Sequence, residues 1–190
     1  MARQIIFSDS IITDVLPNKK LKQEILKELK IQEKSNNGNI LTNKGGFQSK
    51  EISNSYINET IGSVAINNLI KYCNFKKVKF TMVNSWINKN NKDDFNIIHS
   101  HPNSTFSGIY YVDVPDEGGE LVFYRSNNFC NLLDYIDKAN NDTELFTTFN
   151  VKVKNNLLIL FRSYLAHFVM PHKSQRARIS VAFNIKIEHG

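Results

Sequence analysis

The chain has 190 residues, of which 41% are hydrophobic and 22% charged, so we expect one folded domain over residues 1–190 and no disordered tail. The formal charge of +6 comes mostly from lysines spread along the chain, which favours a solvated surface and argues against a nucleic-acid partner. No apolar run reaches the ~18–20 residues of a membrane span, and the N-terminus lacks the apolar stretch of a signal peptide. Two cysteines are too few for a disulfide framework or a Cys-rich zinc site, so we expect a cytoplasmic protein.

Residues 1–75 are predicted to form a helical support region with loops. A first helix begins after Asn18, a possible cap, and should end near Asn36. Residues 35–55 are polar and glycine-rich and are predicted to be a loop. A second helix is expected over 58–73. Apolar residues recur at helical spacing in both helices: Leu21, Ile25, Leu26 and Leu29 in the first, and Ile61, Ala65, Leu69 and Tyr72 in the second.

From residue 76 onward the pattern changes to short strands, because β-branched and aromatic residues alternate with polar ones. A loop is predicted at 88–94, a glycine turn at 115–119 and an irregular segment at 125–148 with a short helix near 132–139. About eight strands are predicted: 78–87, 95–101, 107–114, 120–124, 149–154, 157–161, 167–170 and 177–187. The fold class is therefore mainly β with N-terminal helices (α+β), arranged as a sandwich or open barrel.

Two histidines lie two residues apart on one predicted strand. His99 and His101 face the same side of the strand, because side chains alternate with period two, so both imidazoles can reach one point in space. Metal sites use this geometry. A short His-x-His pattern also occurs as surface histidines, which by itself is the better interpretation.

A third histidine and a late arginine add to this pattern. His167 lies among Leu165, Ala166, Phe168 and Val169, and a polar ring in apolar surroundings needs a partner, either a metal or a hydrogen bond. Eleven residues later, Arg178 and Ser180 share one face of the last strand. An inward arginine would bind a carboxylate through two hydrogen bonds, whereas an arginine on an edge strand would be exposed.

The order of these motifs resembles the Fe(II)/2-oxoglutarate-dependent oxygenases. More narrowly, it is similar to the oxygenase family related to prolyl 4-hydroxylases that is common in phages and bacteria. The resemblance spans Phe80 to Ile187, with GGFQS at 45–49 as an upstream feature. The matching segments are NSWINKNNKDDFNIIHSHPNSTFSGIYYVDVP, GGELVF, LLILFRSYLAHFVMP and RARISVAFN.

The resemblance implies a double-stranded β-helix (jelly-roll, cupin-like) core over residues 76–190, with Fe(II) as cofactor and 2-oxoglutarate as cosubstrate. His99 matches the first metal ligand and His167 the distal ligand. Arg178 matches the residue that pairs with the far carboxylate of 2-oxoglutarate, assisted by Ser180. Tyr111 falls where related hydroxylases place a phenol against that carboxylate.

Further residues are expected around this site. Tyr111 follows directly after Tyr110, so the strand could be shifted by one residue and Tyr110 could face the site in its place. Trp86 is expected to pack under the site, mainly as a core residue, with Asn103 and Asn184 near the ligands. His172 is predicted to be a turn histidine at the mouth of the barrel, and His189 to lie in a frayed C-terminus.

One position departs from the superfamily pattern, His-x-Asp/Glu. Here His101 takes the place of the carboxylate, and three neutral imidazoles leave Fe(II) one negative charge short. We expect the set of His99, His101 and His167. Two alternatives remain: His101 could be the first ligand with Asn103 two residues on, or a carboxylate could come from a neighbouring strand, from Asp113 or Glu120.

The function that the resemblance implies is a dioxygenase that uses molecular oxygen and couples decarboxylation of 2-oxoglutarate to hydroxylation of a peptidyl or small-molecule substrate. If a phage encodes the chain, its compartment would be the host cytoplasm. The alternatives are a non-catalytic jelly-roll binding module and a three-histidine iron dioxygenase that does not use 2-oxoglutarate. The loops at 35–55, 88–94 and 125–148 are expected to line the mouth of the site.

Overall fold

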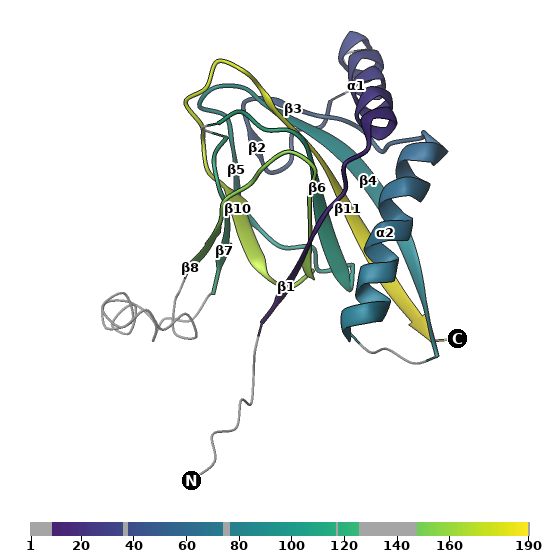
Figure 1. The fold of residues 1–190 in the computed structure, drawn as a ribbon. Coiled ribbons are helices and arrows are strands. Elements are labelled where there is room, and N and C mark those ends of the chain that lie inside the picture. The colour runs from purple at the N-terminus through teal and green to yellow at the C-terminus, as the bar shows by residue number, and fades with distance from the viewer. Residues whose placement is uncertain (1–8, 36–37, 74–76, 117, 126–147, 190) are drawn as a thin grey trace, which may run out of the picture.

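Two antiparallel β-sheets lie face to face in the computed structural model (Figure 1). The structure describes residues 9–35, 38–73, 77–116, 118–125 and 148–189. The six-stranded sheet has the order β1 (Ile11–Val15), β9 (Leu157–Arg162), β6 (Phe106–Asp113), β11 (Arg178–His189), β4 (Val78–Asn90) and β3 (Phe47–Gln48). The five-stranded sheet has the order β2 (Asn43–Lys44), β5 (Phe95–His99), β10 (Ala166–Val169), β7 (Leu121–Tyr124) and β8 (Thr148–Val151).

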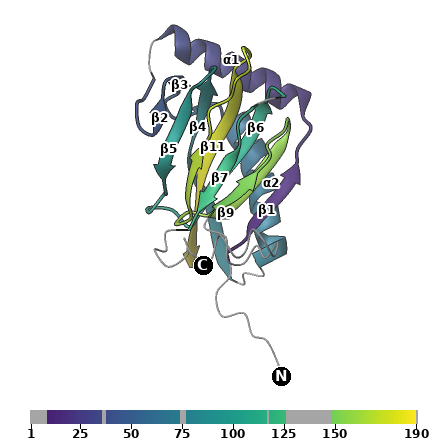
Figure 2. The same cartoon turned by 90° about the vertical axis from the view of Figure 1, so that its left-hand side faces the viewer.

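Two helices cover the outer face of the six-stranded sheet. These are α1 (Lys19–Lys34) and α2 (Ser55–Cys73); in Figure 2, α1 runs across the top of the sheets and α2 lies behind them. The Asn18 side chain caps α1 by accepting a hydrogen bond from the Leu21 N–H at 3.0 Å, as predicted. Most of the apolar stripe of each helix is buried, including Ile25 and Ile61, but Tyr72, which was expected in the second stripe, is 60% exposed.

The central strands of this sheet are buried on both faces, which explains their nearly continuous apolar sequence. On β9, Leu158 and Leu160 pack toward the helices, in the same cluster as Ile25 and Ile61. The alternate residues of β9, including Ile159, point between the two sheets. This alternation gives the molecule two apolar layers on opposite faces of one sheet.

The strand-rich fold with N-terminal helices confirms the predicted class, but several boundaries differ from those predicted, and the two largest differences are these. Residues 1–75 contain β1, β2 and β3, which the helical periodicity of that region did not indicate. Strand β4 runs on through Asn90, so residues 88–90 of the predicted loop are strand: they pair with β11, where Asn88 lies opposite Ser180 and Asn90 opposite Arg178. Asn88 and Asn90 line a pocket, and Lys89 pairs with Glu33 of α1 on the other side of the sheet. All three side chains are polar, so this part of the strand has the composition of a loop.

Other predictions have a mixed outcome. Gly119 has a φ of +70°, as expected for the turn at 115–119. The helix predicted near 132–139 lies outside the described residues, as does Cys130, while Cys73 is a free thiol. No helix within the described ranges combines the length and apolar character needed to cross a membrane.

Candidate metal and cosubstrate site

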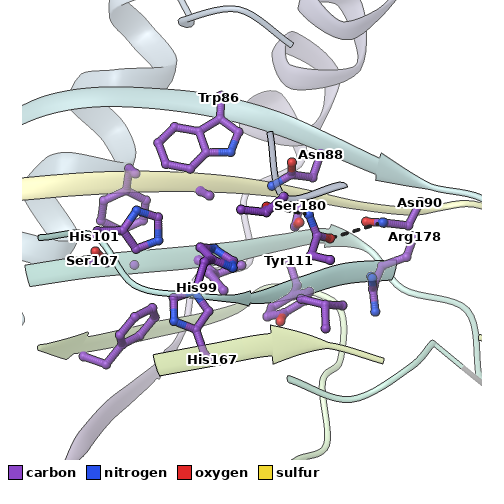
Figure 3. Close-up of a pocket in the computed structure, with 18 residues that line it drawn as sticks. Trp86, Asn88, Asn90, His99, His101, Ser107, Tyr111, His167, Arg178 and Ser180 are labelled. Atoms are coloured by element: carbon purple, nitrogen blue, oxygen red, sulfur yellow. Dashed lines mark hydrogen bonds between the residues drawn. The ribbon is translucent and has the colours of Figure 1, made fainter. Parts of the chain in front are cut away.

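Three histidines, two from the five-stranded sheet and one from the segment after β5, converge on one point (Figure 3). His99 ends β5 and pairs in register with His167 of β10, while His101 follows β5 by two residues. The ligand nitrogens of the three rings all lie within 4.8 Å of one another, and the ring centroids of His99 and His167 are 4.3 Å apart. Among the described residues, this is the group of histidine, cysteine and carboxylate side chains that could hold a metal ion.

Hydrogen bonds orient two of these rings. The Nδ1 atom of His99 lies 2.8 Å from the carbonyl of Ile97, and that of His167 lies 3.0 Å from the carbonyl of Leu165. A carbonyl oxygen only accepts, so each Nδ1 carries the proton and donates it. The Nε2 atom of each ring is therefore left with a free lone pair, the arrangement found in metal-binding histidines.

Burial keeps the imidazoles neutral. Desolvation lowers the pKa of His167 to about 3 and that of His101 to about 4, and it also lowers the pKa of His99. Neutral imidazole is the form that binds a metal. Three neutral nitrogen donors fit a divalent transition metal such as Fe(II).

Aromatic rings enclose the cluster. His167 is 2% exposed and packs edge-on against Phe161, with centroids 4.8 Å apart. The ring centroid of Trp86 lies 5.9 Å from that of His101. The tryptophan is half-buried and lines the pocket, so it is a wall residue rather than the core residue that we expected.

Arg178 lies in the same pocket and is 1% exposed. Its Nη1 donates to the carbonyl of Gly118 at 2.7 Å, whereas its buried Nη2 has no partner. No carboxylate in the described part of the chain forms an ion pair with it. Burial lowers the pKa of Arg178 from its ordinary value. A buried guanidinium with an open donor is a site for an anion.

Tyr111 and Ser180 flank this arginine. They lie opposite each other on β6 and β11, and both line the pocket. Burial raises the pKa of Tyr111 to about 12, against the opposing influence of the Arg178 charge, so the phenol stays protonated. By contrast, Tyr110 points to the helix side and donates to the carbonyl of Leu16 at 3.0 Å. The predicted strand register, with Tyr111 facing inward, is therefore the one observed.

The pocket also contains five polar residues that were not predicted from the sequence: Thr42, Asn88, Asn90, Asn96 and Ser107. A β-bulge hides Asn96 from the period-two rule. The three-residue step from Asn96 to His99 on β5 lies opposite a two-residue step on β10, so both side chains face the pocket.

The remaining predicted residues lie elsewhere. Asn103 is exposed in a turn. Asp113 forms ion pairs with Lys22 and Arg176, and Glu120 accepts a hydrogen bond from Asn150, so neither carboxylate joins the histidines.

Two further predictions concern packing. Asn184 is buried and bonded to Ser107 and Asn84 beside the pocket. His172 lies in the loop between β10 and β11, is 2% exposed and donates from Nε2 to the carbonyl of Asn90. It therefore anchors this loop to β4 and is not the open turn histidine at the mouth that was predicted. The side chain of His189 lies outside the described residues.

The fold and the site define a class of protein, the jelly-roll oxygenases, and solved structures share the fold. A prolyl-4-hydroxylase from Pseudomonas putida superposes with a TM-score of 0.62 at 14% identity, over 94% of each chain. A Trichoplax adhaerens prolyl hydroxylase, in complex with a peptide fragment of hypoxia inducible factor, gives 0.60 at 18% identity, over 94% of this chain and 83% of that one. HygX from Streptomyces hygroscopicus, with nickel and 2-oxoglutarate bound, gives 0.60 at 12% identity, over 94% and 82%.

Sequence comparison gives the family. Residues 84–184, just over half of the chain, match the family described as "Putative 2OG-Fe(II) oxygenase". The chain belongs to this family of 2-oxoglutarate- and iron-dependent oxygenases. No curated protein matches the sequence.

Proposed function

We propose that this protein is an Fe(II)- and 2-oxoglutarate-dependent dioxygenase that hydroxylates a C–H bond of a peptidyl or small-molecule substrate. The observation that carries the proposal is the presence, in one pocket, of a neutral three-histidine cluster and a buried arginine with an open Nη2. When bound, Fe(II) supplies the activation of dioxygen, with 2-oxoglutarate converted to succinate and CO2 while the substrate gains a hydroxyl group.

His99, His101 and His167 would hold the metal. The carbonyls of Ile97 and Leu165 fix two of the rings with Nε2 free, so little ordering remains to be done when the ion arrives. The three-neutral-ligand set leaves the full positive charge of the ion in the pocket. This charge favours an anionic cosubstrate at the remaining positions.

Arg178, Tyr111 and Ser180 would bind the far carboxylate of 2-oxoglutarate. The guanidinium offers a charged donor, and the phenol and the hydroxyl offer neutral donors from the neighbouring strand positions. Ile109, Phe161 and Val169 line the same pocket and would exclude water from the carbon chain of the cosubstrate.

The structural neighbours support this assignment by analogy. HygX binds nickel and 2-oxoglutarate, and the Trichoplax enzyme binds a peptide fragment. A non-catalytic module would have Arg178 exposed or paired with a protein carboxylate, and neither is seen among the described residues. The presence of His101 in place of a carboxylate favours a three-histidine dioxygenase that does not use 2-oxoglutarate. A measurement of 2-oxoglutarate binding distinguishes that enzyme from the proposed one.

The metal assignment is tested with His167→Ala. We expect iron affinity, measured by anaerobic equilibrium dialysis, to fall by at least about 10–100-fold, since even the loss of a supporting contact of a metal ligand costs that much. Succinate formation from 2-oxoglutarate in air should fall with it. Ser100→Ala, an exposed change between the other two histidines, is the matched control and should keep both. Iron affinity in His167→Ala equal to that of the wild type would refute the site.

A further inference from the structure

The side of the pocket formed by β4 and its neighbours carries uncharged amides. Asn88 and Asn90 come from β4, Asn96 from β5, and Thr42 from the segment before β2. Trp86 and Asn88 lie across the pocket from His167 in the view of Figure 3. Apart from the histidines, Arg178 is the one ionisable cation among the described lining residues, and none of them is a carboxylate. The amides therefore form a polar but neutral surface beside the metal cluster.

Two of these amides are held by a chain of hydrogen bonds. Asn90 Nδ2 donates to Asn96 Oδ1 at 3.3 Å, and Asn96 Nδ2 donates to Thr42 Oγ1 at 3.2 Å. The Asn90 carbonyl also accepts a hydrogen bond from His172 at 3.0 Å. Asn90 and Asn96 are both buried, with exposures of 3% and 6%. These contacts fix them as part of the scaffold.

Asn88 is different, because its buried Oδ1 has no hydrogen-bond partner. It lies opposite Ser180 on β11, two residues along β4 from the position opposite Arg178. A buried acceptor without a partner is destabilising, and such groups are rare outside functional sites. The terminal torsion of an asparagine is broad and roughly two-fold, so rotation of the amide can present Oδ1 to the pocket.

The cosubstrate cannot supply the missing partner. Ionised 2-oxoglutarate carries two carboxylates and a keto oxygen, all of which only accept hydrogen bonds. The donor must come from water or, where the substrate displaces water, from the substrate, and this argument rests on the proposed function. A substrate ammonium is disfavoured by the metal charge and Arg178, and an ionised substrate carboxylate has no donor. What remains is a neutral donor.

We infer that Asn88 is a specificity-determining residue, whose Oδ1 accepts a hydrogen bond from an amide N–H or a hydroxyl of the substrate. The neutral surface selects substrates that carry such an uncharged polar group near the C–H bond that reacts. The amide and the hydroxyl share the same donor chemistry, and the experiment separates them.

The test uses three probes of similar size that differ in their donors: acetamide with an amide N–H, isopropanol with a hydroxyl, and acetone with neither. Each is titrated into the isotope-labelled protein loaded with Zn(II) and 2-oxoglutarate. NMR shifts of the Ser180 backbone amide and the Asn90 side-chain amide give the affinities. Wild type is compared with Asn88→Leu, which removes the acceptor, and Asn88→Asp, which keeps one. Asn91→Leu, exposed and outside the pocket, is the control.

In the wild type, in Asn91→Leu and in Asn88→Asp, we expect at least one donor-bearing probe to bind about 2–12-fold more tightly than acetone, the effect of one hydrogen bond. The tighter of acetamide and isopropanol identifies the substrate donor. In Asn88→Leu this preference should vanish. Acetone binding as tightly as both others in the wild type, or an unchanged preference in Asn88→Leu, would overturn the inference.

The same spectra separate this inference from the proposed function. His167 ring signals report Zn(II), and the Ser180 signal reports 2-oxoglutarate before any probe is added. If neither binds but the donor preference is present and depends on Asn88, the donor site stands and the oxygenase assignment falls. If both bind and no preference is found, the oxygenase assignment stands and the role of Asn88 is wrong.

Discussion

Tyr111 and Tyr110 show how a shift of one residue along a strand moves a side chain from the pocket to the helix side of the sheet. The phenol of Tyr111 lies in the pocket beside Arg178 and has a pKa raised to about 12 by burial, so it stays a hydrogen-bond donor at neutral pH. Its neighbour Tyr110 faces the opposite side of the sheet and donates to Leu16. The two tyrosines are therefore chemically identical neighbours in the sequence, but Tyr110 packs between the sheet and the helices and Tyr111 between the two sheets.

We predict that Tyr111→Phe weakens 2-oxoglutarate binding about 2–12-fold, the effect of one lost hydrogen bond, and leaves iron affinity unchanged. Anaerobic calorimetric titration of the iron-loaded protein measures both. Tyr110→Phe is the control and should alter stability but not cosubstrate affinity. The opposite pattern, with a loss in Tyr110→Phe alone, would mean that the phenol of Tyr111 does not contact the cosubstrate.

At the residue scale, the sequence predicted the charged and metal-ligating residues that share the pocket. These are His99, His101, His167 and Arg178, with Ser180, Tyr111 and Trp86 beside them, although their roles remain predictions. Asn88 and Asn90 were missed because three asparagines in a run of polar residues are typical of a loop. Asn96 was missed because a bulge, which depends on pairing with β10, changes the side that it faces.

Gly108 controls packing at the element scale, in the middle of β6. It lies opposite Phe183 of β11 and Leu160 of β9. A Cβ atom at this position would meet the Phe183 ring and would lie 2.8 Å from Leu160 Cδ2. The missing side chain lets the Phe183 ring cross β6 in the layer between sheet and helices.

We predict that Gly108→Ala lowers the free energy of unfolding by about 1–3 kcal/mol, because overpacking forces the ring and the strand apart. Urea denaturation followed by circular dichroism measures it. Gly62→Ala in α2 is the control: its Cβ meets the flexible Met82 side chain at 3.2 Å, and alanine favours a helix by about 1 kcal/mol over glycine. Equal stability of Gly108→Ala and wild type would contradict this packing account.

At the element scale, periodicity predicted both helices and the strands from 78 onward. Strands β1, β2 and β3 could not be predicted, since each is held by a distant partner: β1 by β9, β2 by β5 and β3 by β4. β2 and β3 are two residues long, too short to show alternation. The distant pairing, and not local propensity, determines these elements.

The buried histidines link the stability of the whole molecule to pH. The pKa of His167 is about 3 in the folded protein, whereas an unfolded histidine titrates near 6.5. Below pH 6.5 the unfolded chain therefore binds protons that the folded chain does not. The metal-free protein should lose stability as the pH falls from 6.5 toward 3.

We predict that His167→Leu makes this loss shallower by up to about 1.4 kcal/mol per pH unit, the contribution of one proton. Urea denaturation of metal-free wild type and variant at pH 7.5, 5.5 and 4.5 measures the difference. Identical pH slopes would show that His167 is protonated freely in the folded state and is not buried as described.

The central claim is that one pocket binds iron and 2-oxoglutarate together, and anaerobic titration of the Fe(II)-loaded protein with 2-oxoglutarate tests it most directly. The account predicts a visible charge-transfer band that saturates, with an affinity about 10–100-fold weaker in Arg178→Ala, which loses a charged hydrogen-bond donor. Arg176→Ala, at an exposed arginine paired with Asp113, should match the wild type. Bound iron without a band in the wild type would contradict the account and favour a three-histidine site that does not use 2-oxoglutarate.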